Sequence, residues 1–150
     1  MTDVFVLRLL EHIHGHLGWL AVAALLHPVV LLRNPKRRAR LSVVLCVAML
    51  AATAAIGAYI YPEYRSRIKQ HIFIERPQIG WLFERKEHLA VGALAFALAG
   101  CIAHLAAPRF ADDALRRQIA LLAHRAFVIA LLLAVVIATL GLVVATYKTF

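Results

Sequence analysis

Four long apolar runs, separated by charged turns, constrain this chain more than any other feature of its sequence. They lie at about 12–32, 41–61, 88–107 and 114–146, and each has about the twenty residues that an α-helix needs to cross a hydrocarbon core about 30 Å thick. Inside lipid no water satisfies the backbone amides, so only the helical form is available to such segments. The sequence therefore predicts an all-α fold, an integral membrane four-helix bundle that forms a single transmembrane domain.

The composition supports this interpretation and argues against a soluble domain. Hydrophobic residues make up 63% of the 150 residues, and charged residues only 17%. A soluble chain of this size has too much surface for its volume to hide so much Leu, Ala and Val. The net charge of +9 could suggest nucleic acid, but Lys and Arg gather at the ends of the apolar runs, where they anchor helices. We therefore expect the lipid bilayer, and no nucleic acid, as a partner.

Turn residues mark the ends of the runs. A basic turn at 33–40 ends the first run, and Pro62 closes the second. The polar segment 62–87 is expected to be an extramembrane loop, because it is rich in charges and contains breakers. Asp112 or Asp113 is expected to cap the fourth helix, since a short carboxylate accepts hydrogen bonds from the free amides of a helix start.

The distribution of charge predicts the orientation in the membrane. The turn between the first two helices and the turn between the last two are short and basic, whereas segment 62–87 mixes cations with acids. Short loops rich in Lys and Arg stay in the cytoplasm. We expect a multi-pass protein of the plasma membrane (the bacterial inner membrane), with both termini and segment 62–87 outside or in the periplasm. No small-residue cleavage site follows the first apolar run, so we expect that helix to be retained.

The eight histidines are the chemically conspicuous feature of so apolar a chain. Ionisable residues at membrane depth are costly, which makes them functional candidates by default. The helix directions predict an outer layer of histidines made by His12, His14, His16 and His88. They predict an inner layer made by His27, His104 and His124. At 100° per residue, the two α-helical positions 16 and 27 project from one face, about 20° apart in angle and about 16 Å apart in height.

Histidines paired across a bundle in two layers are the arrangement that two stacked b-type haems require, because neutral imidazole nitrogens bind both axial positions of the iron. In this layering the sequence resembles a small four-helix b-type cytochrome, and the resemblance of pattern extends loosely over the whole chain. It implies one or two b-type haems, electron transfer, and a quinone as a possible redox partner. It also implies ligand pairs, namely His16 with His88, and His27 with His104 or His124. Arg125 would then pair with a haem propionate, or else extend to the cytoplasmic surface.

A metal site is a second interpretation of the outer histidines. In an extended segment the alternating histidines would share one side and could hold zinc or copper, whereas in a helix His12 and His16 share a side and His14 points away. Glu84 and His88 form an i, i+4 pair at a helix start and could complete or support such a site. The alternative is a solvated helix start, whose acids the helix dipole favours.

These patterns favour a membrane electron-transfer subunit of a larger respiratory or photosynthetic complex over a stand-alone enzyme. Two alternatives remain open. One is a structural or accessory subunit whose histidines hold helices together, and the other is a membrane protein that handles copper or zinc. The two cysteines, Cys46 and Cys101, lie inside apolar runs and are expected to be small buried hydrophobes.

Overall fold

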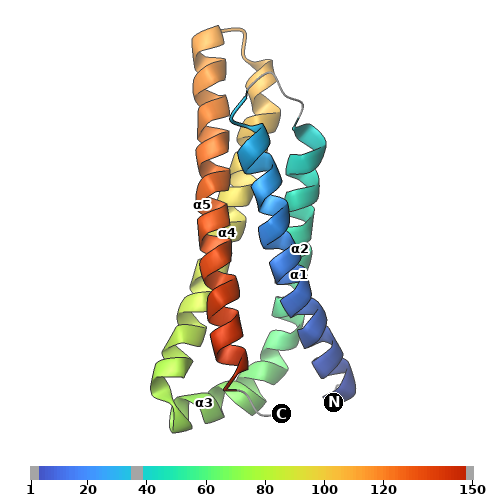
Figure 1. Cartoon of the computed structure of the whole chain (residues 1–150), viewed down its shortest axis with the longest axis vertical. Coiled ribbons are helices and arrows are strands. Elements are labelled where there is room, and N and C mark those ends of the chain that lie inside the picture. The colour runs from blue at the N-terminus through green and yellow to red at the C-terminus, as the bar shows by residue number, and fades with distance from the viewer. Residues whose placement is uncertain (1–3, 35–38, 148–150) are drawn as a thin grey trace.

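A computed structural model describes residues 4–34 and 39–147 of the chain. In these residues four long helices run along one axis as a bundle (Figure 1). They are α1 (Val4–Leu31), α2 (Arg40–Tyr64), α4 (Pro77–Ala106) and α5 (Asp113–Ala145). Short elements connect them, namely the π-helical turn η1 (Arg65–Lys69), α3 (Gln70–Glu75) and the 3-10 turn η2 (Ala107–Arg109). The prediction of an all-α four-helix bundle is confirmed.

The helical segments are long and apolar enough to cross a membrane. The candidate spans are Val4–Leu31, Arg40–Glu75, Pro77–Arg109 and Asp113–Ala145. Their outward surfaces carry large exposed apolar side chains, among them Leu20, Val91 and Leu132. A soluble helix would carry polar residues on that side. The chain is therefore a multi-pass membrane protein, and lipid covers the apolar side chains that water would not solvate.

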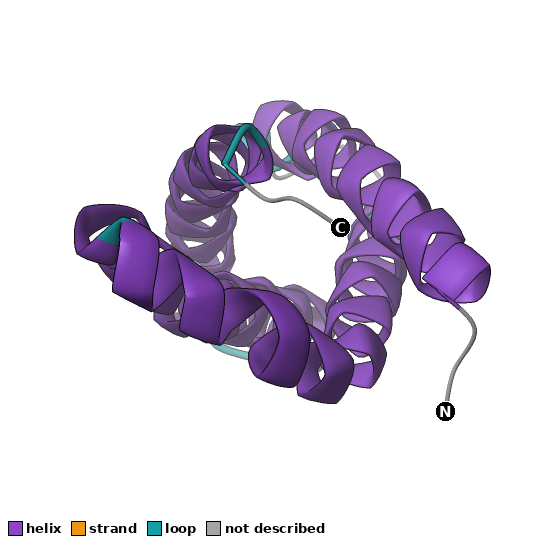
Figure 2. Cartoon of the chain, turned by 90° about the horizontal axis from the view of Figure 1, so that it is seen from below, coloured by secondary structure: helices purple, strands orange, loops and turns teal. Residues whose placement is uncertain are grey.

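The four long helices form a ring when the bundle is viewed along its axis (Figure 2). α1 packs against α2 and α5, and α4 packs against the same two helices. The core contains the fully buried side chains of Leu25, Val43 and Phe127. α4 and α5 approach closely at Gly100, where a Cβ atom would lie 2.9 Å from Cδ2 of Phe127. Small residues permit such close approach between transmembrane helices.

The segment 62–87, expected to be a loop, is instead helical on both sides of Arg76. The α2 helix continues past Pro62 into η1 and α3, and α4 begins at Pro77 (Figure 1). A proline is well tolerated at the first helical position, because the amide that it lacks would have no partner there. The physical reason for the added helix is a second apolar cluster. Its buried members are Ile68, Ile72, Phe83 and Val144.

The other helix boundaries agree with the sequence to different degrees. α1 begins at Val4, earlier than the expected start at 12, and α4 begins earlier than the expected start at 88. The expected cap of the last helix is confirmed at Asp112. Its Oδ1 accepts hydrogen bonds from the backbone amides of Ala114 at 2.7 Å and Leu115 at 3.3 Å.

Candidate functional site

Among the outer histidines of α1, His14 is the one that faces a neighbouring helix. Its Nδ1 lies 2.9 Å from the backbone oxygen of Thr53 on α2. Because a carbonyl oxygen only accepts, Nδ1 is the donor, and Nε2 keeps the lone pair in the neutral ring. The ring packs against Gly57, where a Cβ atom would lie 2.8 Å from Cε1 of His14. His14 therefore holds α1 to α2.

His16 and His27 share one face of α1, and that face points away from the bundle. Both side chains are exposed. At 100° per residue they lie about 150° to 170° from the centre of the buried side of the helix. That buried side is formed by Leu7, Ala21, Leu25, Pro28 and Val29. Neither histidine makes a hydrogen bond to any residue that the structure describes.

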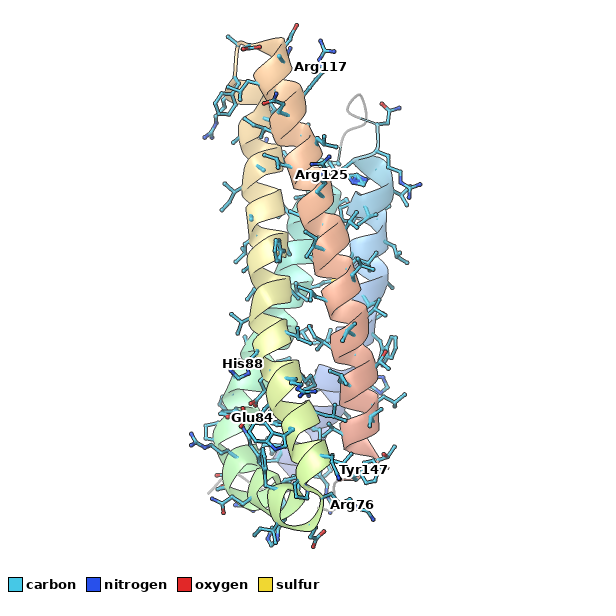
Figure 3. The ribbon with its side chains drawn as sticks, turned by 90° about the vertical axis from the view of Figure 1, so that its left-hand side faces the viewer. Arg76, Glu84, His88, Arg117, Arg125 and Tyr147 are labelled. Atoms are coloured by element: carbon cyan, nitrogen blue, oxygen red, sulfur yellow. The ribbon has the colours of Figure 1, made fainter. Side chains whose placement is uncertain are left out.

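The remaining outer histidines bond to their own helices. Nδ1 of His12 donates to the backbone oxygen of Arg8 at 2.9 Å, and Nδ1 of His88 donates to the backbone oxygen of Glu84 at 2.8 Å. Both imidazoles are exposed. The carboxylate of Glu84 forms an ion pair with Lys69 at 2.6 Å. Figure 3 shows His88 and Glu84 on the lower part of α4.

The structure does not gather the residues of the expected zinc or copper site. Within 4–34 and 39–147, no group of three His, Cys, Asp or Glu side chains is placed to hold a metal ion. His12, His16 and His88 are exposed on helix surfaces. His14 lies at the contact between α1 and α2, and Glu84 pairs with Lys69.

His124 and Arg125 lie in an open pocket of about 740 Å³ between the end of α1 and the first half of α5. Arg33 and Arg117 also line this pocket. Its apolar wall consists of Leu32, Ala120, Leu121, Val128 and Ile129. Figure 3 shows Arg117 and Arg125 along the upper part of α5. We call this space the basic pocket.

The predicted pairs of histidine ligands are not brought together inside the chain. His16, His27 and His88 are exposed on outward helix surfaces, and buried apolar side chains fill the core between the helices. The basic pocket contains His124 but neither His27 nor the half-buried His104. A bis-histidine haem needs two imidazoles that face one iron. This arrangement of one chain does not fit such a haem, so a haem on His16 or His27 would need its second ligand from another chain.

A partly buried polar cluster that the sequence did not predict lies at the other end of the bundle, around Lys69. Lys69 is only 8% exposed. Its Nζ lies 2.6 Å from Oε1 of Glu84 and 3.1 Å from Oε2 of Glu87, and it donates to the hydroxyl of Tyr61 at 3.1 Å. It also lies 5.3 Å from the ring centroids of Tyr61 and Phe83, a distance typical of cation–π contacts. We call these residues the Lys69 cluster.

The local backbone explains why Lys69 reaches this position. It is the last residue of η1, and a π-helical turn changes the direction in which the following side chains point. Its acidic partners, Glu84 and Glu87, are three residues apart and therefore lie on one face of α4. That spacing was visible in the sequence. The π-helical turn was not visible, and without it nothing in the sequence distinguishes Lys69 from the other charges of segment 62–87.

Lys86 adds a second ammonium group to this end of the bundle. Its Nζ lies 5.0 Å from the ring centroid of Phe83, and 4.0 Å from the position that a Cβ atom would take at Gly141 of α5. The positive charge of Lys86 is close enough to interact electrostatically with His14 and Glu87. The interior at this end is thus polar and charged, whereas the middle of the bundle is apolar.

Comparison with known proteins adds no relative. No protein family model, curated protein sequence or solved structure matches this chain. The function must therefore be inferred from the outward histidines of α1, the basic pocket and the Lys69 cluster.

Proposed function

We propose that this protein is a subunit of a larger membrane complex, and that the outward face of α1 contacts another membrane chain. The observation that carries this proposal is the position of His16 and His27. Both are exposed away from their own bundle, and neither bonds to a described residue. Imidazoles that face hydrocarbon are costly, and such residues normally face protein or a cavity. A partner helix would supply the missing hydrogen bonds.

Electron transfer through a b-type haem is the specific form of this proposal. His16 and His27 lie on the same outward face, so each could supply one axial ligand while the partner chain supplies the other. The exposed Ala23 and Leu20 lie on the same side of α1 and would offer an apolar surface. A haem held there would supply one-electron chemistry, and a quinone would be its redox partner. The complex would then be respiratory or photosynthetic.

A non-redox accessory subunit is the second candidate. It is favoured by His14, whose ring holds α1 to α2 through the 2.9 Å bond to Thr53. It is also favoured by the Lys69 cluster, which joins η1 to α4 through ion pairs at 2.6 and 3.1 Å. In this form the polar side chains stabilise the bundle, and His16 and His27 bond to a partner helix without a cofactor.

We place the protein in the plasma membrane, the inner membrane in a bacterium, with the basic end of the bundle in the cytoplasm. Short basic loops remain on the cytoplasmic side. The described arginines of this end are Arg33, Arg40, Arg109, Arg116 and Arg117. Lys36, Arg37 and Arg38 of the same turn lie outside the described residues. The start of α1 and the end of α5 lie at the opposite end (Figure 1), which would put both termini outside or in the periplasm.

The test combines a visible spectrum with a determination of the chains in the assembly. The protein is purified in mild detergent from haem-replete cells, as wild type and as the variants His16→Ala, His27→Ala and His71→Ala. His71 is the matched control, because it is exposed on α3 and away from the outward face of α1. We expect a multi-chain assembly that the first two variants weaken and the control retains.

The spectrum then distinguishes the two forms of the proposal. Reduced α and Soret bands that disappear in His16→Ala or His27→Ala would support the haem form. An assembly without visible absorption would support the accessory form. A protein that purifies as a single chain, or an assembly unaffected by both α1 variants, would overturn the proposal.

A further inference from the structure

The basic pocket combines a concentrated positive charge with an apolar wall. Arg33 lies in the turn that follows α1, while Arg117 and Arg125 lie on α5. Among residues 4–34 and 39–147, no acidic side chain lines the pocket. We infer that the pocket binds the headgroup of an anionic phospholipid.

The acids nearest in sequence to the pocket already have other partners. Asp112 caps α5 through its bond to the amide of Ala114, and Asp113 pairs with Arg116. None of the three pocket arginines forms an ion pair with a residue in the described part of the chain. Basic pockets between transmembrane helices on the cytoplasmic side bind anionic headgroups. The charge of this pocket therefore favours an anion that comes from outside the protein.

The order of side chains along α5 indicates a lipid. Arg117, Leu121 and Arg125 follow one another at i, i+4 spacing and therefore form one stripe, with the two cations about 12 Å apart. Val128 and Ile129 continue the pocket wall toward the middle of the bundle. The wall is charged near the end of the bundle and apolar nearer its middle. A phospholipid has the same order, with a charged headgroup at the surface and acyl chains inside the membrane. A small soluble anion would use only the charged end.

The depth of Arg125 supports the same occupant. The residues that precede it include Leu121 and Leu122, which are exposed apolar side chains on the bundle surface. Arg125 therefore lies deeper along α5 than side chains that face lipid. Placing a charged group at that depth costs free energy unless the group reaches the interface or pairs with an opposite charge. A phosphate diester held in the basic pocket would provide that counter-charge, and the apolar wall would hold its acyl chain.

The test is a lipid titration of the detergent-purified protein, followed by native mass spectrometry. The two probes are dioleoyl phosphatidylglycerol, which is anionic, and dioleoyl phosphatidylcholine, which has the same acyl chains and no net charge. The test variant is Arg117→Gln with Arg125→Gln. The matched control is Arg40→Gln with Arg109→Gln, which removes two charges from the same end of the bundle but none from the pocket, and leaves Arg116 paired with Asp113.

We expect wild type to prefer phosphatidylglycerol, and the test variant to bind it about thirtyfold more weakly, as the loss of two membrane-proximal cations predicts. The control variant should retain the preference, since exposed charges farther away are screened. If the test variant fails to fold, each single variant should still weaken binding about fivefold.

Four results would each overturn the inference. The first is equal binding of the two lipids by wild type, and the second is an equal loss in the control variant. The third is full competition by inorganic phosphate, which would identify a site for a free anion. The fourth is a Soret band that disappears in the test variant, which would assign the arginines to haem propionates.

Discussion

The Nζ atom of Lys69 lies 2.6 Å from Oε1 of Glu84, an ion pair that joins η1 to α4 at the end of the bundle opposite the basic pocket. Glu87 adds a second carboxylate at 3.1 Å. Lys69 is buried, whereas the side chains of Glu84 and Glu87 are 31% and 25% exposed. The pair therefore lies between a surface ion pair, which contributes little, and a fully buried one.

We expect Lys69→Met to lower the free energy of unfolding by about 2 kcal/mol, between the values typical of surface and buried pairs. The substitution would keep most of the side-chain volume but leave two carboxylates facing each other. The measurement is reversible unfolding in mixed detergent micelles. Arg67→Met is the control, because its 2.8 Å pair with Glu63 is a partly exposed i, i+4 contact. The control should change stability by less than about 0.5 kcal/mol, and an equal loss in both variants would contradict the assignment.

Gly100→Ala should destabilise the contact between α4 and α5. The added Cβ would lie 2.9 Å from Cδ2 of Phe127 and 3.2 Å from the backbone oxygen of Ala123. Overpacking of this kind costs about 1–3 kcal/mol. Gly15→Ala is the control, since a Cβ there meets nothing within 4 Å. Helix propensity alone should make that variant more stable by up to about 1 kcal/mol. Thermal unfolding measures the stability of both variants. The prediction would be wrong if Gly15→Ala lost stability and Gly100→Ala did not.

His14→Ala should destabilise the bundle by about 1–2 kcal/mol, because it removes an interhelical hydrogen bond and the packing of a half-buried ring. His12→Ala should change stability by less than about 0.5 kcal/mol, since its exposed ring bonds to the backbone of its own helix. Both values can be measured by unfolding in mixed micelles. Similar effects from the two substitutions would show that His14 does not hold α1 to α2.

The orientation predicts which end of the bundle can be labelled from outside the cell. The test uses a background with Cys46→Ala and Cys101→Ala. Ser66 is exposed in η1, and Ala111 is exposed in the connection between η2 and α5. These two connecting segments lie at opposite ends of the bundle (Figure 1). A membrane-impermeant maleimide should modify Ser66→Cys in intact spheroplasts, and Ala111→Cys only after lysis. The reverse pattern would invert the topology and place the basic pocket on the outer side.

The sequence alone determined those features that depend on composition, length and near neighbours along the chain. It predicted the all-α fold and the membrane-spanning character, because lipid leaves no other form for long apolar runs. It also predicted the cap at Asp112, because the amides that this carboxylate accepts from lie only two and three residues away. The angle between His16 and His27 around α1 likewise follows from helical geometry.

The tertiary structure decided which side of each helix meets its neighbours. In a soluble bundle the apolar stripe marks the buried side, but a membrane helix is apolar toward both lipid and protein. The sequence therefore could not show that His14 faces α2 while His16 and His27 face outward. It also could not place Lys69 between Glu84 and Glu87, because that contact depends on a π-helical turn and on the packing of α3 against α4.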